Sequence, residues 1–298
     1  MKRYFTVVSM VCWVVLAGIA GATAQEAQKA NPATDFEYDL NESGDGVVIY
    51  KYKSTATEVI IPAVIEDFPV VRIASEAFSG TNIVSIVFPD SVTSIGDKCC
   101  QYCEFLTKVV LPKTLTYIPP RMFESCTSLK EFTLPEGIKE IASGAFAGSG
   151  LEAIEIPDSV KEIGDWSPFY EDSNKGVFAD CQNLKTVTVG NGIEVISTQA
   201  FSGCKNLTAV MIGSKIRYVE ESAFSDCTNL ATVTIGSGIR VIGNCAFSNC
   251  TSLTTVNIGA ENVKYENNYN GRGAFSGCSA LSLKEKQKLR KTGYTGGF

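Results

Sequence analysis

A repeat of 23 residues in the second half of the chain limits its possible folds more than any other feature. Phe178, Phe201, Phe224 and Phe247 recur at this spacing, each followed by a cysteine three residues later and a leucine six residues later. An alternating V-x-V/I run, a glycine-containing turn and an I-x-x-I/V segment complete the unit. A fixed period of about 20–29 residues is typical of a solenoid, in which each unit buries its apolar face only against its neighbours.

The unit extends beyond this region, because nine positions fill the phenylalanine slot and most lie 22 or 23 residues apart. These positions are Phe78, Cys100, Phe123, Phe146, Phe178, Phe201, Phe224, Phe247 and Phe275. Two longer steps place insertions at about residues 165–175 and 266–272. Both insertions fall between the I-x-x-I segment and the next Ala-Phe pair, so we expect both to emerge from the same edge of the solenoid.

Each unit supplies two extended segments, and the first has the pattern L-x-x-V-x-I. In residues 207–212 the period of two turns Val210 and Ile212 inward and Ala209 and Met211 outward. The second segment is I-x-x-I, as in residues 239–242. Stacking of these units predicts parallel strands ~4.8 Å apart.

The N-terminus has the features of a secretory signal peptide. Lys2 and Arg3 precede an apolar run over residues 5–20, and Ala22-Thr23-Ala24 provides small residues for cleavage after Ala24. An uncleaved membrane anchor is the alternative, although the run is short for a spanning helix. We expect residues 1–24 to be the signal peptide and residues 25–35 a polar linker. The mature protein would then be exported, as a secreted or cell-surface protein that does not insert into the membrane.

Both ends of the array depart from the repeat, as a solenoid requires to cover its outermost apolar faces. We expect an N-terminal capping region over residues 36–71, leucine-rich repeats over residues 72–281, and a C-terminal cap over residues 282–298. In the first cap, two β-rich runs flank a turn at residues 41–46 and predict a β-hairpin. In the last, residues 282–291 have helix-forming composition.

The C-terminal segment has two interpretations. We expect its apolar residues to fold onto the last repeat: Leu283, Leu289, Tyr294 and Phe298. Its basic run would alternatively bind an anionic surface.

The chain resembles the BspA-like leucine-rich-repeat surface proteins, also called the treponemal type. Their unit reads roughly L-x-x-I-x-I-P-x-x-V-x-x-I-G-x-x-A-F-x-x-C, which residues 151–164 match in its first part and residues 222–227 in its second. The resemblance covers about residues 36–281. The departures are the two insertions and Cys99-Cys100 in place of Ala-Phe.

The resemblance implies a secreted or surface-exposed microbial protein that binds other macromolecules, host matrix proteins in some relatives, and it supplies no catalytic residue. The predicted fold is a mainly β leucine-rich-repeat solenoid, right-handed and curved, with an N-terminal β cap and a short C-terminal helical cap.

Seven cysteines share the position three residues after the phenylalanine slot: Cys103, Cys126, Cys181, Cys204, Cys227, Cys250 and Cys278. In an exported protein, disulfides are one interpretation. Stacked side chains, however, keep their Cβ atoms about as far apart as their Cα atoms, beyond the usual ~3.8 Å of a disulfide. A buried thiol also fills space and donates a weak hydrogen bond to a turn carbonyl. We favour a ladder of reduced thiols, with a disulfide framework as the alternative.

Composition argues against several classes of function. The chain has no histidine, so it lacks Ser-His, Cys-His and H-E-x-x-H sites. The C-x-x-C at residues 100–103 places Cys100 in a core slot, and thiols one repeat apart do not make a zinc site. The net charge of −6 becomes −8 when Lys2 and Arg3 are removed, which disfavours binding to nucleic acid. We therefore expect no enzymatic activity, no metal, no cofactor and no nucleic-acid partner.

Two surfaces are candidates for binding. The first is the outward strip of the L-x-x-V-x-I strands, uncharged and rich in small side chains: Thr186, Thr188, Ala209, Met211, Thr232, Thr234, Thr255 and Asn257. Outward threonine also suits any solvated strand. The second lies at the insertions, whose aromatic residues are typical interface anchors or would pack back onto the solenoid: Trp166, Phe169, Tyr170, Tyr265 and Tyr269.

These features together predict an exported protein that binds an extracellular protein or glycan, with adhesion to host or neighbouring cells as its role. The alternative is a structural component of an envelope or matrix that has no discrete ligand.

Overall fold

The computed structural model describes residues 29–164, 175–266 and 272–298. The chain separates into two units, residues 1–30 and 31–298, and the second unit holds every helix and strand described. The predicted signal peptide lies outside the described residues, as do Trp166, Phe169, Tyr170 and Tyr269.

The second unit begins with a 3-10 turn, η1 (Ala33–Asp35), followed by the β-hairpin expected around residues 41–46. The strands of this region are β1 (Phe36–Leu40), β2 (Val47–Tyr52), β4 (Val64–Ile65), β5 (Phe68–Ile73) and β7 (Ser94–Ile95). β1 pairs antiparallel with β2, and β2 pairs in parallel with β5. β5 also pairs antiparallel with β4 and in parallel with β7. Tyr52 stacks on Phe78 at 5.4 Å between ring centroids, so the hairpin packs directly on the first repeat.

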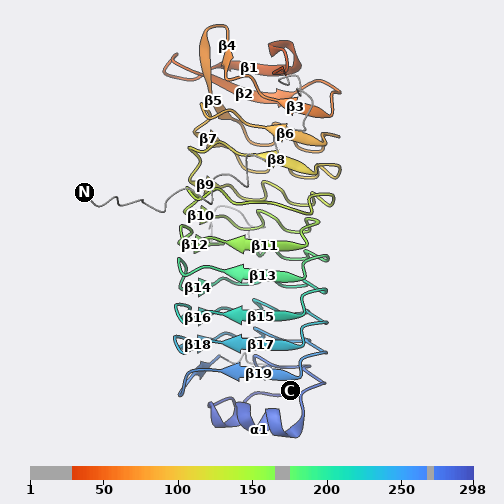
Figure 1. Ribbon diagram of the computed structural model, residues 1–298, viewed down its shortest axis with the longest axis vertical. Helices are drawn as coiled ribbons and strands as arrows, with labels where there is room; N and C mark the ends of the chain where they lie inside the picture. The colour runs from red at the N-terminus through yellow and green to blue at the C-terminus, as the bar shows by residue number, and fades with distance from the viewer. Residues whose placement is uncertain (1–28, 165–174, 267–271) are drawn as a thin grey trace, which may run out of the picture. The chain divides into compact units, whose positions relative to one another are not determined.

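Later repeats contribute to two series of parallel strands (Figure 1). The first series is β3 (Glu58–Ile60), β6 (Ser85–Val87), β8 (Lys108–Val110), β11 (Ala153–Ile156), β13 (Thr186–Val189), β15 (Ala209–Ile212), β17 (Thr232–Ile235) and β19 (Thr255–Ile258). The second is β9 (Tyr117–Ile118), β10 (Glu140–Ile141), β12 (Glu162–Ile163), β14 (Val195–Ile196), β16 (Tyr218–Val219), β18 (Val241–Ile242) and β20 (Lys264–Tyr265). Paired residues are equivalent positions of neighbouring repeats, as when Thr232 pairs with both Ala209 and Thr255. The parallel stacking predicted from the period is confirmed.

The first series is divided into three sheets, although the repeat predicts one. These sheets are β3–β6–β8, β11–β13 and β15–β17–β19. One break falls at residues 131–134, which form no strand between β8 and β11. At this point Phe132 occupies the inward position that valine or isoleucine holds in the other repeats. Its ring lies 5.2 Å from Phe123 and 4.9 Å from Phe146, so a larger side chain fills the core here than in the repeats that form this strand.

A ladder of phenylalanine rings fills the core between the strand series. From Phe146 to Phe275, neighbouring rings of the ladder stack with centroids 5.2–5.4 Å apart and planes within 10° of parallel. All of these side chains are buried. Because each ring is covered by the rings of the adjacent repeats, the stability of one repeat depends on its neighbours.

The cysteines form a second buried ladder, and the expected hydrogen bond from each thiol to a turn carbonyl is confirmed. The ten described cysteines are free thiols. Sγ of Cys227, for example, donates to the carbonyl of Phe201 at 3.2 Å. The same bond, at 3.1–3.2 Å to the phenylalanine-slot residue of the preceding repeat, is made by Cys103, Cys126, Cys181, Cys204, Cys250 and Cys278. The thiols therefore both fill the turn and satisfy a buried carbonyl.

The last repeat is followed by α1 (Leu283–Lys291), which confirms the predicted C-terminal helix. Ser282 begins the helix, because its hydroxyl accepts a hydrogen bond from the backbone N–H of Glu285 at 3.2 Å. Leu289 and Tyr294 are buried, and Phe298 packs on Tyr294. Leu283 was expected to join them, and this prediction is wrong: its side chain is 80% exposed. The first turn of α1 directs this residue to solvent rather than to the last repeat.

Candidate binding surface

The outward side chains of the first strand series form two rows on one face of the solenoid. Pairing places Thr186 beside Ala153, and it places Thr232 between Ala209 and Thr255. In the second row, Thr188 pairs with Glu155, and Thr234 lies between Met211 and Asn257. The parallel register therefore brings together most of the strip expected from the sequence.

The strip is interrupted between β13 and β15, which belong to different sheets. The space around the glycines that follow β15 and β17 shows the same break. A methyl group on Gly236 would come within 2.7 Å of the Ser214 backbone, whereas one on Gly213 would meet no atom within 4 Å. Thr186 and Thr188 therefore lie on the β11–β13 sheet, and the remaining strip residues lie on the β15–β17–β19 sheet.

Met211 is the most prominent apolar side chain of the strip, with 75% of its surface exposed. It lies in the second row beside Thr234, whose short side chain leaves the thioether of Met211 accessible. Methionine is flexible and polarizable, and it adapts to the shape of a partner surface. This side chain is therefore an anchor of the kind that protein interfaces use.

The far end of the strip is occupied by the C-terminal helix. Nζ of Lys288 donates to Oδ1 of Asn257 at 2.8 Å, and Glu285 accepts from the backbone N–H of Val256 at 3.4 Å. The structure therefore places Asn257 in a contact with α1, which leaves the strip from Ala209 to Thr255 as its open part.

Tyr265 packs against the C-terminal segment and lies away from the strip. Its hydroxyl lies 2.6 Å from Oγ1 of Thr292, and its ring packs against Tyr294 at 5.2 Å. Burial raises its pKa. Tyr265 thus contacts the cap rather than standing free as an aromatic anchor.

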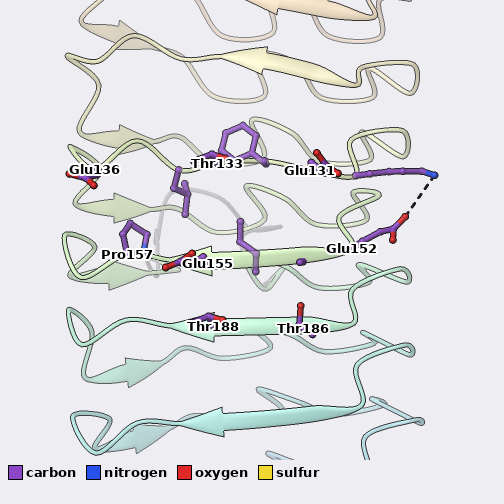
Figure 2. Close-up of a pocket in the computed structure, with 13 residues that line it drawn as sticks. Glu131, Thr133, Glu136, Glu152, Glu155, Pro157, Thr186 and Thr188 are labelled. Carbon is purple, nitrogen blue, oxygen red and sulfur yellow. Dashed lines mark ion pairs between the residues drawn. The ribbon is translucent and has the colours of Figure 1, made fainter. Parts of the chain in front are cut away.

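An open groove of about 650 Å³ lies at the first break in the strand series (Figure 2). Its walls come from residues 130–136, from β11, and from Thr186 and Thr188 of β13. Phe132, Leu134 and Ile154 also line the groove, because the missing strand leaves these core-facing side chains at its floor. The groove joins an apolar floor to the outward strip.

Charge in the groove is unevenly compensated. Glu152 forms ion pairs with Lys185 at 2.8 Å and Lys130 at 3.8 Å, and the hydrogen bond from Lys185 lowers the pKa of Glu152. Glu131, Glu136 and Glu155 also line the groove, and they have no cationic partner among the described residues. Uncompensated negative charge therefore lies both beside this ion-pair network, at Glu131, and farther along the groove, at Glu136 and Glu155 (Figure 2).

Sequence reasoning missed the groove and an exposed aromatic pair. The signal for the groove was a phenylalanine at residue 132, in a strand position otherwise held by valine or isoleucine. The pair is Tyr102 and Phe105, which are 51% and 55% exposed. Phe105 occupies the position before the repeat leucine, where most other repeats have asparagine or serine, so the departure was visible in the sequence.

Within the described ranges, no cluster of three metal-binding side chains occurs. No helix in this part of the chain is both long enough and apolar enough to cross a membrane.

The family model described as BspA type leucine rich repeat region matches residues 49–175 and 172–282, in six copies. Among curated proteins, none matches this chain.

Solved structures with a similar fold include three leucine-rich repeat proteins. A leucine-rich repeat protein from Bacteroides ovatus is 23% identical over 83% of this chain and 68% of that chain, with a TM-score of 0.70. The T. pallidum Leucine Rich Repeat protein is 26% identical over 91% of this chain and 99% of that chain, with a TM-score of 0.58. A leucine-rich repeat protein from Eubacterium ventriosum is 20% identical over 84% and 94% of the two chains, with a TM-score of 0.53.

Proposed function

Because the chain belongs to the BspA-type leucine-rich-repeat family, we propose that it is an exported, non-enzymatic binding protein. Its partner is an extracellular protein or glycan, and its role is adhesion to host or neighbouring cells. The signal-like residues 1–24 support export. Proteins of this repeat architecture present extended surfaces that suit macromolecular partners.

The observation that carries the proposal is the open strip on β15, β17 and β19. Strand pairing holds its side chains in fixed positions, so binding does not require the surface to become ordered first. Met211 provides an exposed apolar anchor within a neutral, polar surround. The aromatic residues Trp166 and Tyr170 of the first insertion are a second proposed contact, which stands on composition alone.

Solid-phase binding of the purified chain to matrix proteins, glycans and microbial cells, at two salt concentrations, tests this proposal. We expect saturable binding to at least one panel member. Met211→Lys should weaken that binding at least about tenfold, because a charge replaces the exposed apolar anchor of the strip.

Val64→Lys is the matched control, because Val64 is also an exposed apolar residue but lies on β4, outside the strip. The double variant Trp166→Ala with Tyr170→Ala tests the insertion: it should lose binding while its melting temperature stays unchanged. Equal binding by Met211→Lys and Val64→Lys would refute the role of the strip. Absence of binding to every panel member would favour a structural role in an envelope or matrix.

A further inference from the structure

We propose that the groove at residues 130–136 binds an extended segment of a partner protein in which basic side chains alternate with apolar ones. This inference rests on the proposed binding function and names the chemistry of the partner at the β11–β13 end of the same face. Its basis is the combination of an apolar floor, an acidic rim and a backbone segment outside the sheet.

The floor selects apolar side chains. Phe132 is half-buried and packs against the aromatic core, while Leu134 and Ile154 are buried but line the groove. An apolar side chain of a partner would remove the exposed part of this floor from water, which stabilises the complex by roughly 25 cal/mol per Å². The open form of the groove suits side chains projecting from a peptide better than an enclosed small molecule (Figure 2).

The rim selects positive charge. Glu131, Glu136 and Glu155 are all exposed, and together they bring three carboxylates to one groove without a cationic partner in the described ranges. The fourth carboxylate of the groove, Glu152, is already neutralised by Lys130 and Lys185 (Figure 2 shows the pair with Lys130). A partner with basic side chains is therefore complementary to the free carboxylates, and complementary charge increases both association rate and selectivity.

The backbone of the groove favours an extended partner. In the repeat of β17, the equivalent N–H of Thr232 donates to the carbonyl of Thr208 at 3.3 Å. The N–H groups of Glu131 and Thr133 have no backbone acceptor among the described residues. An extended peptide presents alternate side chains to opposite sides, so one side of it can lie on the apolar floor while the other carries the basic side chains. Its apolar side chains would face the floor, and its basic side chains would reach the rim.

Fluorescence anisotropy with a labelled (Lys-Val)4 peptide and the purified chain tests the inference. The groove variant is Glu131→Gln with Glu136→Gln and Glu155→Gln. The control variant is Glu37→Gln with Glu42→Gln and Glu104→Gln, which removes the same charge from exposed sites outside the groove. We expect saturable binding to the wild type, at least about tenfold weaker binding to the groove variant, and wild-type affinity in the control.

Two further peptides separate charge from shape. (Lys-Ser)4 keeps the charge and loses the apolar side chains, so it should bind more weakly than (Lys-Val)4 by about fivefold or more. (Glu-Val)4 should not bind. Equal affinity of (Lys-Val)4 for the groove and control variants, or its failure to bind the wild type, would overturn the inference.

The panel assay distinguishes this inference from the proposed function. If (Lys-Val)4 binds the groove and control variants equally while Met211→Lys loses a panel partner, the groove inference fails and the proposed function stays in place. If the wild type binds (Lys-Val)4 at the groove but no panel member, the groove stands and the proposed adhesion role fails.

Discussion

Burial of Cys181 and Cys227 in the thiol ladder raises the pKa of each thiol, and this makes the stability of the solenoid sensitive to alkaline pH. Burial raises the pKa of Cys227 to about 12 and that of Cys181 to about 11, from an ordinary value of 9.0. Because the folded pKa is the higher one, the protonated thiol stabilises the folded state fully below about pH 9, and this contribution is lost as pH rises toward the folded pKa. At about pH 10, each such thiol should lower the free energy of unfolding by about 1.4 kcal/mol. Urea unfolding at several values between about pH 8 and pH 10 measures this loss, and Cys227→Ala should show a shallower decline than the wild type. Cys245→Ala is the control, because Cys245 is only partly buried. Identical slopes in the wild type and Cys227→Ala would contradict this account.

The break at residues 131–134 shows how one side chain changes an element of a repeat. We expect Phe132→Val to restore a strand, because valine at this inward position permits pairing in β15, β17 and β19. Hydrogen–deuterium exchange measures the effect: the amides of Glu131 and Thr133 should exchange freely in the wild type and become at least about tenfold more protected in the variant. The amides of Thr232 and Thr234, already paired in β17, serve as the internal reference. Unchanged exchange at residues 131 and 133 would show that another feature causes the break.

Residues 131–134 also show which features of the fold can be predicted from the sequence and which cannot. The stacked rings, the bonds of the thiols and the parallel register were predictable, because identical neighbours impose the same environment on each repeat. The groove was not foreseen, because it depends on the volume of Phe132, and a pattern of apolar positions treats phenylalanine and valine alike. Tyr265 and Asn257 were assigned to open surfaces, since their contacts with Thr292 and Lys288 depend on where the C-terminal segment folds back.

For the array of repeats as a whole, stability depends on how its last apolar surface is covered. Tyr294 is buried, packs on Tyr265 and Phe275, and accepts a hydrogen bond from the backbone N–H of Phe275 at 3.3 Å. Removing a buried aromatic side chain costs about 3–5 kcal/mol, so Tyr294→Ala should expose the last repeat and lower the unfolding midpoint in urea. Because each repeat is stabilised only by its neighbours, amides of β19 and β20 should lose protection before those of β15 and β17. Leu283→Ala, at an exposed position of the same cap, should change stability by less than about 0.5 kcal/mol. If Tyr294→Ala lowered protection equally in all four strands, the repeats would unfold as one cooperative block, and the C-terminal segment would stabilise that block rather than cap its end.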